Sequence, residues 1–413
     1  HATNTSSFLS GNNTGNGGAI YVGKGGVLTI QNSIEIAGSN AGGFGGAIYL
    51  EEGATLNITS GNIHGNNAGL DGGAIYAANG ARINISGAPI IRNNTSQISF
   101  TDNIFLQDGM LLTRGGAMAA GAEVGISLEN GLGQFIDSRD GILAEYFKAD
   151  SDIFYTVGET TEGGKNGLGL ILNSDTMSQR WSNAVKRSQD NGGAPVRFDI
   201  IENWVAGANG NFASAGTTGF VDGAIYLPSN ATIIITLVGG NKIDRGLTGK
   251  AAVTNGAVII NEGTLLLRGD GVITGGNNTG NGGGIINNAS GKLVMQGGVV
   301  TGNTAANGAG IYGTGSFTLS NIEVKNNHAN VNYGGIFADN NVKLTVSGKL
   351  NLYGNTAGAD RVASNVNADG FIVKGALTGS KIGLSLTGAS KAFTSGLKAS
   401  ELADVLAVFS SDT

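Results

Sequence analysis

The sequence predicts an all-β fold, a right-handed parallel β-helix arranged as two tandem modules with capping elements. Three observations predict it: a repeat of about 27 residues, short apolar runs within each repeat, and 73 glycines among 413 residues. Three strands with turns between them make one coil of a solenoid. One coil cannot bury its own apolar side chains, whereas coils stacked about 4.8 Å apart bury them.

The coils of the first module occupy residues 1–99. A Gly-Gly-Ala-Ile-Tyr marker occurs there three times, and its tyrosines are Tyr21, Tyr49 and Tyr76. Asparagine and glycine fill the corners between strands, because both residues accept left-handed backbone angles. One asparagine precedes each marker at a constant distance, and we expect this set to hydrogen-bond along its own stack: Asn12, Asn40 and Asn67. We expect this module to be truncated at its N-terminus.

Residues 100–152 are predicted to close the first module, because their pattern recurs in residues 361–413. The matching segments are Asn103-Ile104 with Asn365-Val366, Val124 to Leu128 with Ile382 to Leu386, Phe135 with Phe393, Phe147 with Phe409, and Ser151-Asp152 with Ser411-Asp412. We interpret each copy as a few extended strands plus a short helix covering the open end of the coils. An uncovered end would expose unpaired backbone groups.

Residues 153–205 are predicted to be a linker and the N-terminal cap of the second module. One apolar helix face is formed by residues four apart: Met177, Trp181 and Val185. Asp175 or Thr176 is placed to cap that helix. The next apolar residues alternate as in a first strand: Val196, Phe198 and Ile200. We interpret Trp181 and Trp204 as plugs of the first coil rather than as an aromatic platform for a sugar.

The coils of the second module occupy residues 206–360, where the marker returns in relaxed form. Its five copies are Gly223-Ala224-Ile225-Tyr226, Gly256-Ala257-Val258, Gly283-Gly284-Ile285, Ala309-Gly310-Ile311-Tyr312 and Gly334-Gly335-Ile336-Phe337. Residues 361–413 then form the closing element of this module. The repetition therefore predicts the same architecture twice.

Charge and composition exclude several partner classes. The chain carries 24 Lys and Arg against 30 Asp and Glu, and it has no basic cluster, so nucleic acid is not an expected partner. No run of 18 apolar residues occurs, so no membrane span is expected in this fragment. The absence of cysteine excludes disulfides and thiolate metal sites.

The Gly-Gly-Ala-Ile repeats, with Phe8-Leu9-Ser10-Gly11-Asn12 ahead of the first, resemble the paired motifs of polymorphic outer-membrane protein passengers. The fuller resemblance is to adhesin-like surface proteins of anaerobic bacteria and archaea, which carry β-helix modules followed by a segment like Asn103 to Leu128. The resemblance implies a pectin-lyase-like solenoid, an extracellular location at the cell surface and a role in adhesion.

Catalysis is weighed because many β-helices are polysaccharide lyases or hydrolases. Such hydrolases need carboxylates that converge on one sugar bond, and the Asp-Asp pair and Gly-His-Gly triplet typical of them do not occur. The acids of the coils are sparse and share no register with a base: Glu35, Glu51, Glu52, Asp71, Asp270 and Glu323. We therefore expect no catalytic residues, no metal site and no cofactor.

Other polar residues are interpreted as parts of the framework. We expect His64 to point outward, His328 to occupy a corner, and the Arg268-Gly269-Asp270 triplet to lie between two strands. The acids of the first closing element are interpreted as a solvated face: Asp137, Asp140, Asp150 and Asp152.

The sequence thus predicts a non-enzymatic cell-surface adhesin or stalk module with a rigid binding face. Tyr21, Tyr49 and Tyr76 are the candidate ligand-binding residues, provided that they form an outward ladder. The expected partners are a host-surface protein or a glycan, and the chain is expected to be monomeric. Two alternatives stay open: a polysaccharide-binding or polysaccharide-degrading β-helix enzyme, and a purely structural spacer.

Overall fold

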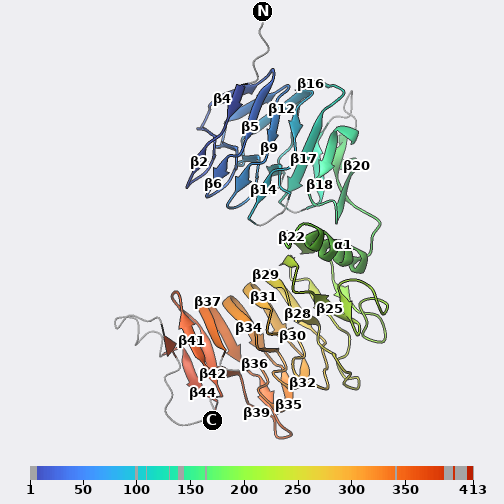
Figure 1. Cartoon of the computed structure of the whole chain (residues 1–413), viewed down its shortest axis with the longest axis vertical. Helices are drawn as coiled ribbons and strands as arrows, with labels where there is room; N and C mark the ends of the chain where they lie inside the picture. The colour runs from blue at the N-terminus through green and yellow to red at the C-terminus, as the bar shows by residue number, and fades with distance from the viewer. Residues whose placement is uncertain are drawn as a thin grey trace, which may run out of the picture. The chain divides into compact units, whose positions relative to one another are not determined.

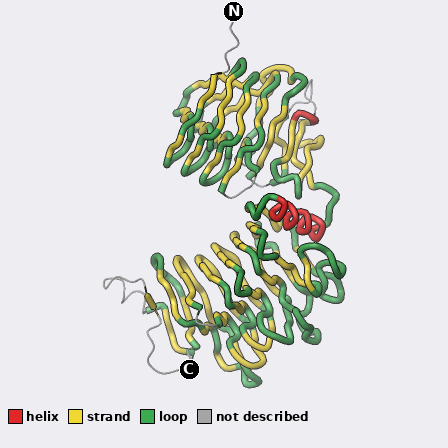
Figure 2. Tube along the Cα trace, in the orientation of Figure 1, coloured by secondary structure: helices red, strands yellow, loops and turns green. Residues whose placement is uncertain are grey.

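The computed structural model describes residues 7–97, 101–107, 109–129, 131–137, 144–162, 165–339, 342–385, 394–395 and 407–412. They form a β-solenoid of about 13 turns built from stacked parallel sheets (Figures 1 and 2). The predicted fold class, a right-handed parallel β-helix, is therefore confirmed. The chain divides into two compact units, unit 1 (His1–Asp175) and unit 2 (Thr176–Thr413).

Unit 1 consists of four rows of parallel strands, with one strand of each row per coil. Row 1 contains β1 (Ser7–Leu9), β5 (Ile34–Ala37), β9 (Asn62–His64), β13 (Ile90–Ile91) and β17 (Glu123–Leu128). Row 2 contains β2 (Asn12–Asn13), β6 (Asn40–Ala41), β10 (Asn67–Ala68) and β14 (Thr95–Ser96). Row 3 contains β3 (Ile20–Val22), β7 (Ile48–Leu50), β11 (Ile75–Ala77) and β15 (Ile104–Leu106). Row 4 contains β4 (Val27–Ile30), β8 (Thr55–Ile58), β12 (Arg82–Gly87) and β16 (Thr113–Met118).

The asparagine corner of each coil is itself a short strand, whereas the sequence predicted three strands per coil. Asn40 pairs with Asn12 and Asn67 pairs with Asn40 in parallel register, so this corner adds row 2 to the three expected rows. A corner of two residues is too short to show the alternation by which strands are recognised in a sequence.

The end of unit 1 continues the coils and then turns into an antiparallel hairpin. It contains β18 (Gly133–Ile136), the 3₁₀ turn η1 (Ala144–Tyr146), β19 (Phe147–Ala149), β20 (Tyr155–Glu162) and β21 (Lys165–Leu172). β19 pairs with β17, and β21 pairs with both β18 and β20. The hairpin, which the sequence placed in a linker and cap at 153–205, thus packs within unit 1.

Unit 2 begins with α1 (Met177–Asp190), as the apolar spacing predicted. The Thr176 side chain accepts a hydrogen bond from the Gln179 backbone, and the Gln179 side chain accepts one from Thr176, which forms a capping box. α1 packs against β22 (Pro195–Ile200), the predicted first strand (Figure 1). Trp181 is fully buried there, with its ring 5.1 Å from that of Phe198, so the interpretation of Trp181 as a plug is confirmed.

The coils of unit 2 use longer strands, and most of them join one continuous sheet. The marker strands are β25 (Ala224–Leu227), β28 (Ile259–Asn261), β30 (Ile285–Asn287), β33 (Ile311–Gly313), β36 (Ile336–Ala338) and β40 (Val366–Asn367). The strands that follow the markers are β26 (Thr232–Leu237), β29 (Thr264–Thr274), β31 (Lys292–Thr301), β34 (Ser316–Lys325), β37 (Lys343–Tyr353) and β41 (Gly370–Val373).

Shorter strands complete the coils of unit 2. They are β23 (Trp204–Val205), β24 (Phe220–Val221), β27 (Lys242–Asp244), β32 (Thr304–Asn307), β35 (His328–Asn332), β38 (Thr356–Ala357), β39 (Val362–Ala363), β42 (Lys381–Leu384), β43 (Thr394–Ser395) and β44 (Phe409–Ser411). Phe393 and the expected helix of the second closing element lie outside the described residues.

The core of each unit is a set of aliphatic ladders that run along the axis. The isoleucines of the markers pair in register from Ile48 to Ile75 to Ile104, and all three are fully buried. In unit 2 the same row runs from Ile225 to Ile336. Because the side chains of a strand alternate, the residue after each of these isoleucines faces outward.

Candidate functional site

The three predicted tyrosines form one stacked row on the outside of unit 1. Tyr21, Tyr49 and Tyr76 pair in register on β3, β7 and β11. The ring centroids of Tyr21 and Tyr49 are 5.2 Å apart, and those of Tyr49 and Tyr76 are 5.6 Å apart with nearly parallel planes. Phe105 continues the row on β15, with its centroid 5.6 Å from that of Tyr76. We call these four residues the aromatic row.

Exposure falls steeply along the aromatic row. Tyr21 is 51% exposed, Tyr49 is half-buried, and Tyr76 is only 7% exposed because the Phe44 ring also packs against it. Burial, followed by the nearby Asp71 charge, raises the pKa of Tyr76 to about 12, so this phenol stays protonated. Neighbouring rings stack on one another, so Tyr21 offers the largest free ring surface.

Carboxylates accompany the tyrosines of this row in both units. In unit 1 partial desolvation, followed by the Glu51 carboxylate, raises the pKa of Tyr21. In unit 2 the Tyr226 hydroxyl donates to Glu262 Oε2 over 2.8 Å. Tyr49 is the partner of Tyr21 on the next coil, and Glu51 follows Tyr49 by two residues. Ile260 is the partner of Tyr226 on the next coil, and Glu262 follows Ile260 by two residues. A phenol paired with a carboxylate of the following coil is therefore a shared feature of the two units.

The corresponding row of unit 2 is less aromatic. Tyr226 pairs with Ile260, which pairs with Ile286, and only then does the row return to Tyr312 and Phe337. The Tyr312 and Phe337 rings meet edge to face with centroids 5.5 Å apart. A run of consecutive stacked rings is thus a feature of unit 1.

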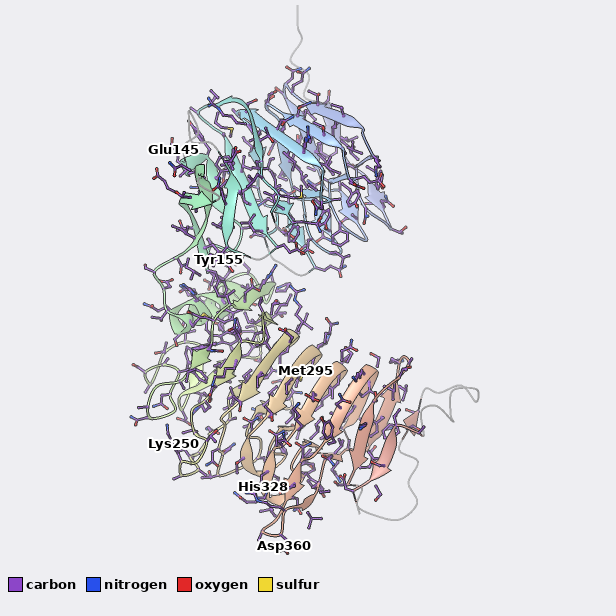
Figure 3. All side chains as sticks on the ribbon, turned by 180° about the vertical axis from the view of Figure 1, so that it is seen from behind. Glu145, Tyr155, Lys250, Met295, His328 and Asp360 are labelled. Carbon is purple, nitrogen blue, oxygen red and sulfur yellow. The ribbon has the colours of Figure 1, made fainter. Side chains whose placement is uncertain are left out.

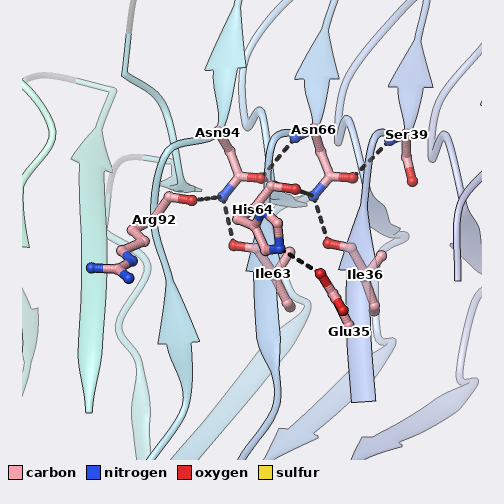
Figure 4. A network of polar contacts seen from close by, with 8 residues as sticks. All are labelled: Glu35, Ile36, Ser39, Ile63, His64, Asn66, Arg92 and Asn94. Atoms are coloured by element: carbon pink, nitrogen blue, oxygen red, sulfur yellow. Dashed lines mark hydrogen bonds and ion pairs between the residues drawn. The ribbon is translucent and has the colours of Figure 1, made fainter. Parts of the chain in front are cut away.

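A ladder of buried amides runs along the inside of unit 1 (Figure 4). The Ser39 backbone N–H donates to Asn66 Oδ1 over 2.8 Å. Both the backbone N–H and Nδ2 of Asn66 donate to Asn94 Oδ1, over 3.1 and 2.8 Å. Asn94 makes the same two bonds to Asn103 Oδ1. Each side-chain oxygen in the ladder therefore accepts from the coil before it, while Nδ2 of Asn66 and of Asn94 donates both to the next oxygen of the ladder and to a backbone carbonyl of the preceding coil, at Ile36 and Ile63.

The ladder of unit 1 ends on a carboxylate. The backbone N–H of Asn103 donates to Asp150 Oδ2 over 2.6 Å, and its Nδ2 donates to Asp150 Oδ1 over 2.5 Å. Ser127 Oγ adds a third bond over 2.9 Å. An aspartate fits this place because its ionised side chain only accepts, and the incoming groups only donate. Burial raises the pKa of Asp150 to about 6 against the lowering effect of these bonds.

Unit 2 repeats the ladder and its end. Asn303 donates to Asn327, Asn327 to Asn355 and Asn355 to Asn365, each through a backbone N–H and Nδ2. Asn365 then donates to both carboxylate oxygens of Asp412 over 2.7 and 2.6 Å, and Ser385 Oγ donates to the same group. The ladders of the two units thus share a polar terminus, in which an asparagine donates to both oxygens of an aspartate.

Sequence reasoning found the outer asparagine row and missed this inner ladder. Asn40 Nδ2 donates to Asn12 Oδ1 over 3.0 Å, as expected. The residues of the buried ladder come one position before those of the outer row in each coil. The repeat spacing of Asn66 and Asn94 is the sequence signal that could have revealed them. The interpretation of Asp150 as part of a solvated face is wrong, since this side chain is buried. The structural counterpart of Asp412 is Asp150 and not Asp152.

One buried carboxyl of unit 1 has no equivalent in unit 2. Asp102 Oδ2 accepts from the Gly72 backbone over 2.9 Å, and its Oδ1 has no hydrogen-bond partner among the described residues. Burial, followed by the Asp150 charge, raises the pKa of Asp102 to about 7. Ser364 stands at this place in unit 2, where it bonds Asn355 as Asp102 bonds Asn94.

The two coil histidines serve contacts between neighbouring coils. His64 Nε2 lies 2.8 Å from Glu35 Oε1 on the outer surface (Figure 4). His328 lies in a corner strand of unit 2 (Figure 3), with Nδ1 3.0 Å from Thr356 Oγ1. Burial lowers the pKa of His328. Their predicted placements, outward and at a corner, are confirmed.

The Arg268-Gly269-Asp270 triplet lies within β29 at a register shift between Gly269 and Val272. Arg268 Nε donates to Thr236 Oγ1, and Asp270 accepts from the Gly240 backbone. These bonds join the triplet to the coil before it.

Within the described part of the chain, no group of three or more His, Asp or Glu side chains is arranged to hold a metal ion. The described helices include none that is long and apolar enough to span a membrane. Comparison with family models, with curated proteins and with solved structures finds no match to this chain.

Proposed function

We propose that this chain is a non-enzymatic, extracellular display module of a cell-surface adhesin or stalk. The observation that carries the proposal is the use of buried polar side chains in both units. Asn66, Asn94 and Asn103 bond one another along the axis and end on Asp150, and unit 2 repeats the arrangement. Such a ladder fixes the stacking of coils, which is what a rigid support needs.

The binding face that we propose is the aromatic row with its flanking carboxylates. Tyr21 offers an exposed ring, and Glu51 lies beside its hydroxyl. An aromatic ring next to hydrogen-bonding groups suits the apolar face and hydroxyls of a sugar, and it equally suits a protein side chain. A host-surface glycan or protein is therefore the proposed ligand class.

An array of glycans and host-surface proteins tests this proposal. We expect saturable binding that Tyr21→Ala and Tyr49→Ala weaken at least tenfold. Tyr353→Ala in unit 2 is the matched control, because Tyr353 is also an exposed tyrosine, at 40%, but lies outside the aromatic row. Binding that all three variants retain would contradict the proposed face, and no binding at all would favour a spacer.

A panel of polysaccharide substrates tests the alternative that the chain is a polysaccharide-degrading enzyme. Product release that disappears when one carboxylate is replaced by its amide would overturn the non-enzymatic assignment. Glu51→Gln and Glu262→Gln are the variants to use, because these carboxylates lie beside tyrosines of the outer row.

A further inference from the structure

Nine asparagines of the chain are followed directly by glycine, the sequence context in which an asparagine loses its side-chain ammonia most easily. The backbone nitrogen of the following residue attacks the side-chain carbonyl carbon, and glycine has no Cβ to obstruct this approach. The nine are Asn16, Asn79, Asn130, Asn166, Asn191, Asn209, Asn255, Asn281 and Asn307. Asn130 lies outside the described residues. The structure separates the others by whether their two reacting groups are held in hydrogen bonds.

Asn79 and Gly80 form the tip of a tight turn between β11 and β12. The Ala81 N–H donates to the Ala78 carbonyl over 2.9 Å across this turn, and both Asn79 and Gly80 are exposed. Among the described residues, neither the Asn79 side-chain amide nor the Gly80 N–H has a hydrogen-bond partner. The attacking nitrogen and the amide that it attacks are therefore both free of bonds that would hold them apart.

Every other described Asn-Gly pair has at least one of these two groups in a hydrogen bond. In six pairs the glycine N–H donates to a backbone carbonyl, and these glycines are Gly17, Gly192, Gly210, Gly256, Gly282 and Gly308. In the remaining pair, Asn166 Oδ1 accepts from the Thr161 hydroxyl over 2.7 Å. A bonded group must first be released by local opening of the structure. Asn79 and Gly80 need no such opening.

We infer that Asn79 is a modification site, at which the side chain deamidates spontaneously in the folded protein. The Gly80 nitrogen loses its proton and forms a bond to Cγ of Asn79, while the bond from Cγ to Nδ2 breaks and ammonia leaves with that proton. Water then opens the resulting succinimide ring at either carbonyl, which gives aspartate or isoaspartate. The reaction needs only water, and it does not depend on the proposed function.

The product changes both the charge and the backbone length of this corner. An isoaspartate adds one methylene group to the main chain between two strands whose register is fixed by the neighbouring coils. The Asn79 N–H donates to Gln107 Oε1 over 2.7 Å, and the Gly80 carbonyl accepts from the Gly53 N–H over 3.2 Å, so a longer main chain weakens both contacts. The new carboxylate also lies near Glu52, because a Cβ on Gly80 would come within 3.3 Å of Glu52 Cγ.

Peptide mapping of the full chain during incubation at mildly alkaline pH tests the inference. The mass increase of deamidation is followed for each peptide, in the folded chain and in the chain unfolded by urea. Asn209 is the internal reference, because it is also exposed and also lies in the sequence Ala-Asn-Gly, but its glycine N–H donates to the Gly207 carbonyl over 2.8 Å. We expect Asn79 to convert at least tenfold faster than Asn209 in the folded chain. In urea the two rates should converge, because that hydrogen bond is lost.

Asn79→Gln is the chemical control, because attack on the longer side chain must close a less favourable six-membered ring. We expect this variant to lose the fast release of ammonia, whereas the matched variant Asn209→Gln keeps it. Conversion of Asn209 as fast as Asn79 in the folded chain would overturn the inference. A tenfold difference that persists in urea would also overturn it, because the neighbouring residues in the sequence, and not the fold, would then set the rate.

Discussion

Individual polar residues inside the solenoid are chosen for the direction of their hydrogen bonds. Each ladder asparagine donates a backbone N–H and an Nδ2–H to the side-chain oxygen of the next ladder residue, so that oxygen always receives two donors from the coil before it. The last group must then be a pure acceptor, and Asp150 and Asp412 supply it. A buried donor left without this acceptor would cost about 1–3 kcal/mol.

Asp102 makes the stability of unit 1 depend on pH. Its carboxyl loses its proton near pH 3.9 in an unfolded chain and at about 7 in the folded one. Its contribution is fully present below about pH 4 and is lost as pH rises toward 7. Burial shifts Asp150 in the same direction.

We therefore expect the thermal midpoint of unit 1 to fall between pH 5 and pH 8, as followed by far-ultraviolet circular dichroism. Asp102→Asn keeps an acceptor for the Gly72 N–H and removes the ionisation, so its midpoint should change less with pH. A wild-type midpoint that rises over this range, or equal pH profiles for the two proteins, would contradict the assignment.

For single residues, the sequence predicts which row of stacked side chains a residue belongs to better than it predicts how deeply that side chain is buried. The marker repeat predicts the outward row of Tyr21, Tyr49 and Tyr76, and these residues pair in register in the structure. The steep burial along that row depends on Phe44, which packs across from a loop. Asp150 escaped detection because its ladder partner, Asn103, lies 47 residues away in the chain.

Between strands and corners, some glycines are needed because the backbones of neighbouring coils approach closely there. Gly46 has ordinary backbone angles, yet an added Cβ would meet the Gly73 carbonyl oxygen and lie 2.6 Å from the Asn67 carbonyl carbon. Conformational freedom therefore does not explain this residue, whereas it does explain Gly45 next to it, with φ at 69°.

We expect Gly46→Ala to destabilise unit 1 by about 1–3 kcal/mol, because the strands must separate to admit the methyl group. Gly23→Ala is the matched control, since the nearest atom to its added Cβ is Glu51 Oε2 at 3.8 Å. Urea unfolding followed by circular dichroism measures both. Equal effects of the two substitutions would show that packing at Gly46 is looser than the structure indicates.

Elements with local signals were predicted well, and those that depend on distant pairing were not. The helix α1 follows from the spacing of Met177, Trp181 and Val185 and from a cap within its first turn. Nothing in the local sequence of β20 and β21 indicates that this hairpin belongs to unit 1. Its membership of unit 1 follows from the pairing of β21 with β18. Strand pairing over 30 residues is a tertiary effect that a single sequence does not display.

At the scale of the whole molecule, both tryptophans of the chain lie in unit 2. Trp181 and Trp204 belong to unit 2, and unit 1 has none. Tryptophan fluorescence therefore follows the unfolding of unit 2, while far-ultraviolet circular dichroism follows both units. Each unit has its own core ladders and its own terminal aspartate, which predicts two separate transitions.

We expect Asp150→Asn to lower the stability of unit 1 by about 1–3 kcal/mol, because an amide brings a donor against the donors of Asn103. The fluorescence midpoint should stay unchanged, and only the dichroism transition should move. Asp412→Asn is the reciprocal variant and should move the fluorescence midpoint. Glu52→Gln controls for lost charge, since Glu52 makes only an exposed ion pair with Lys24. If Asp150→Asn shifted both signals equally, the two units would unfold in one cooperative transition, which would contradict this prediction.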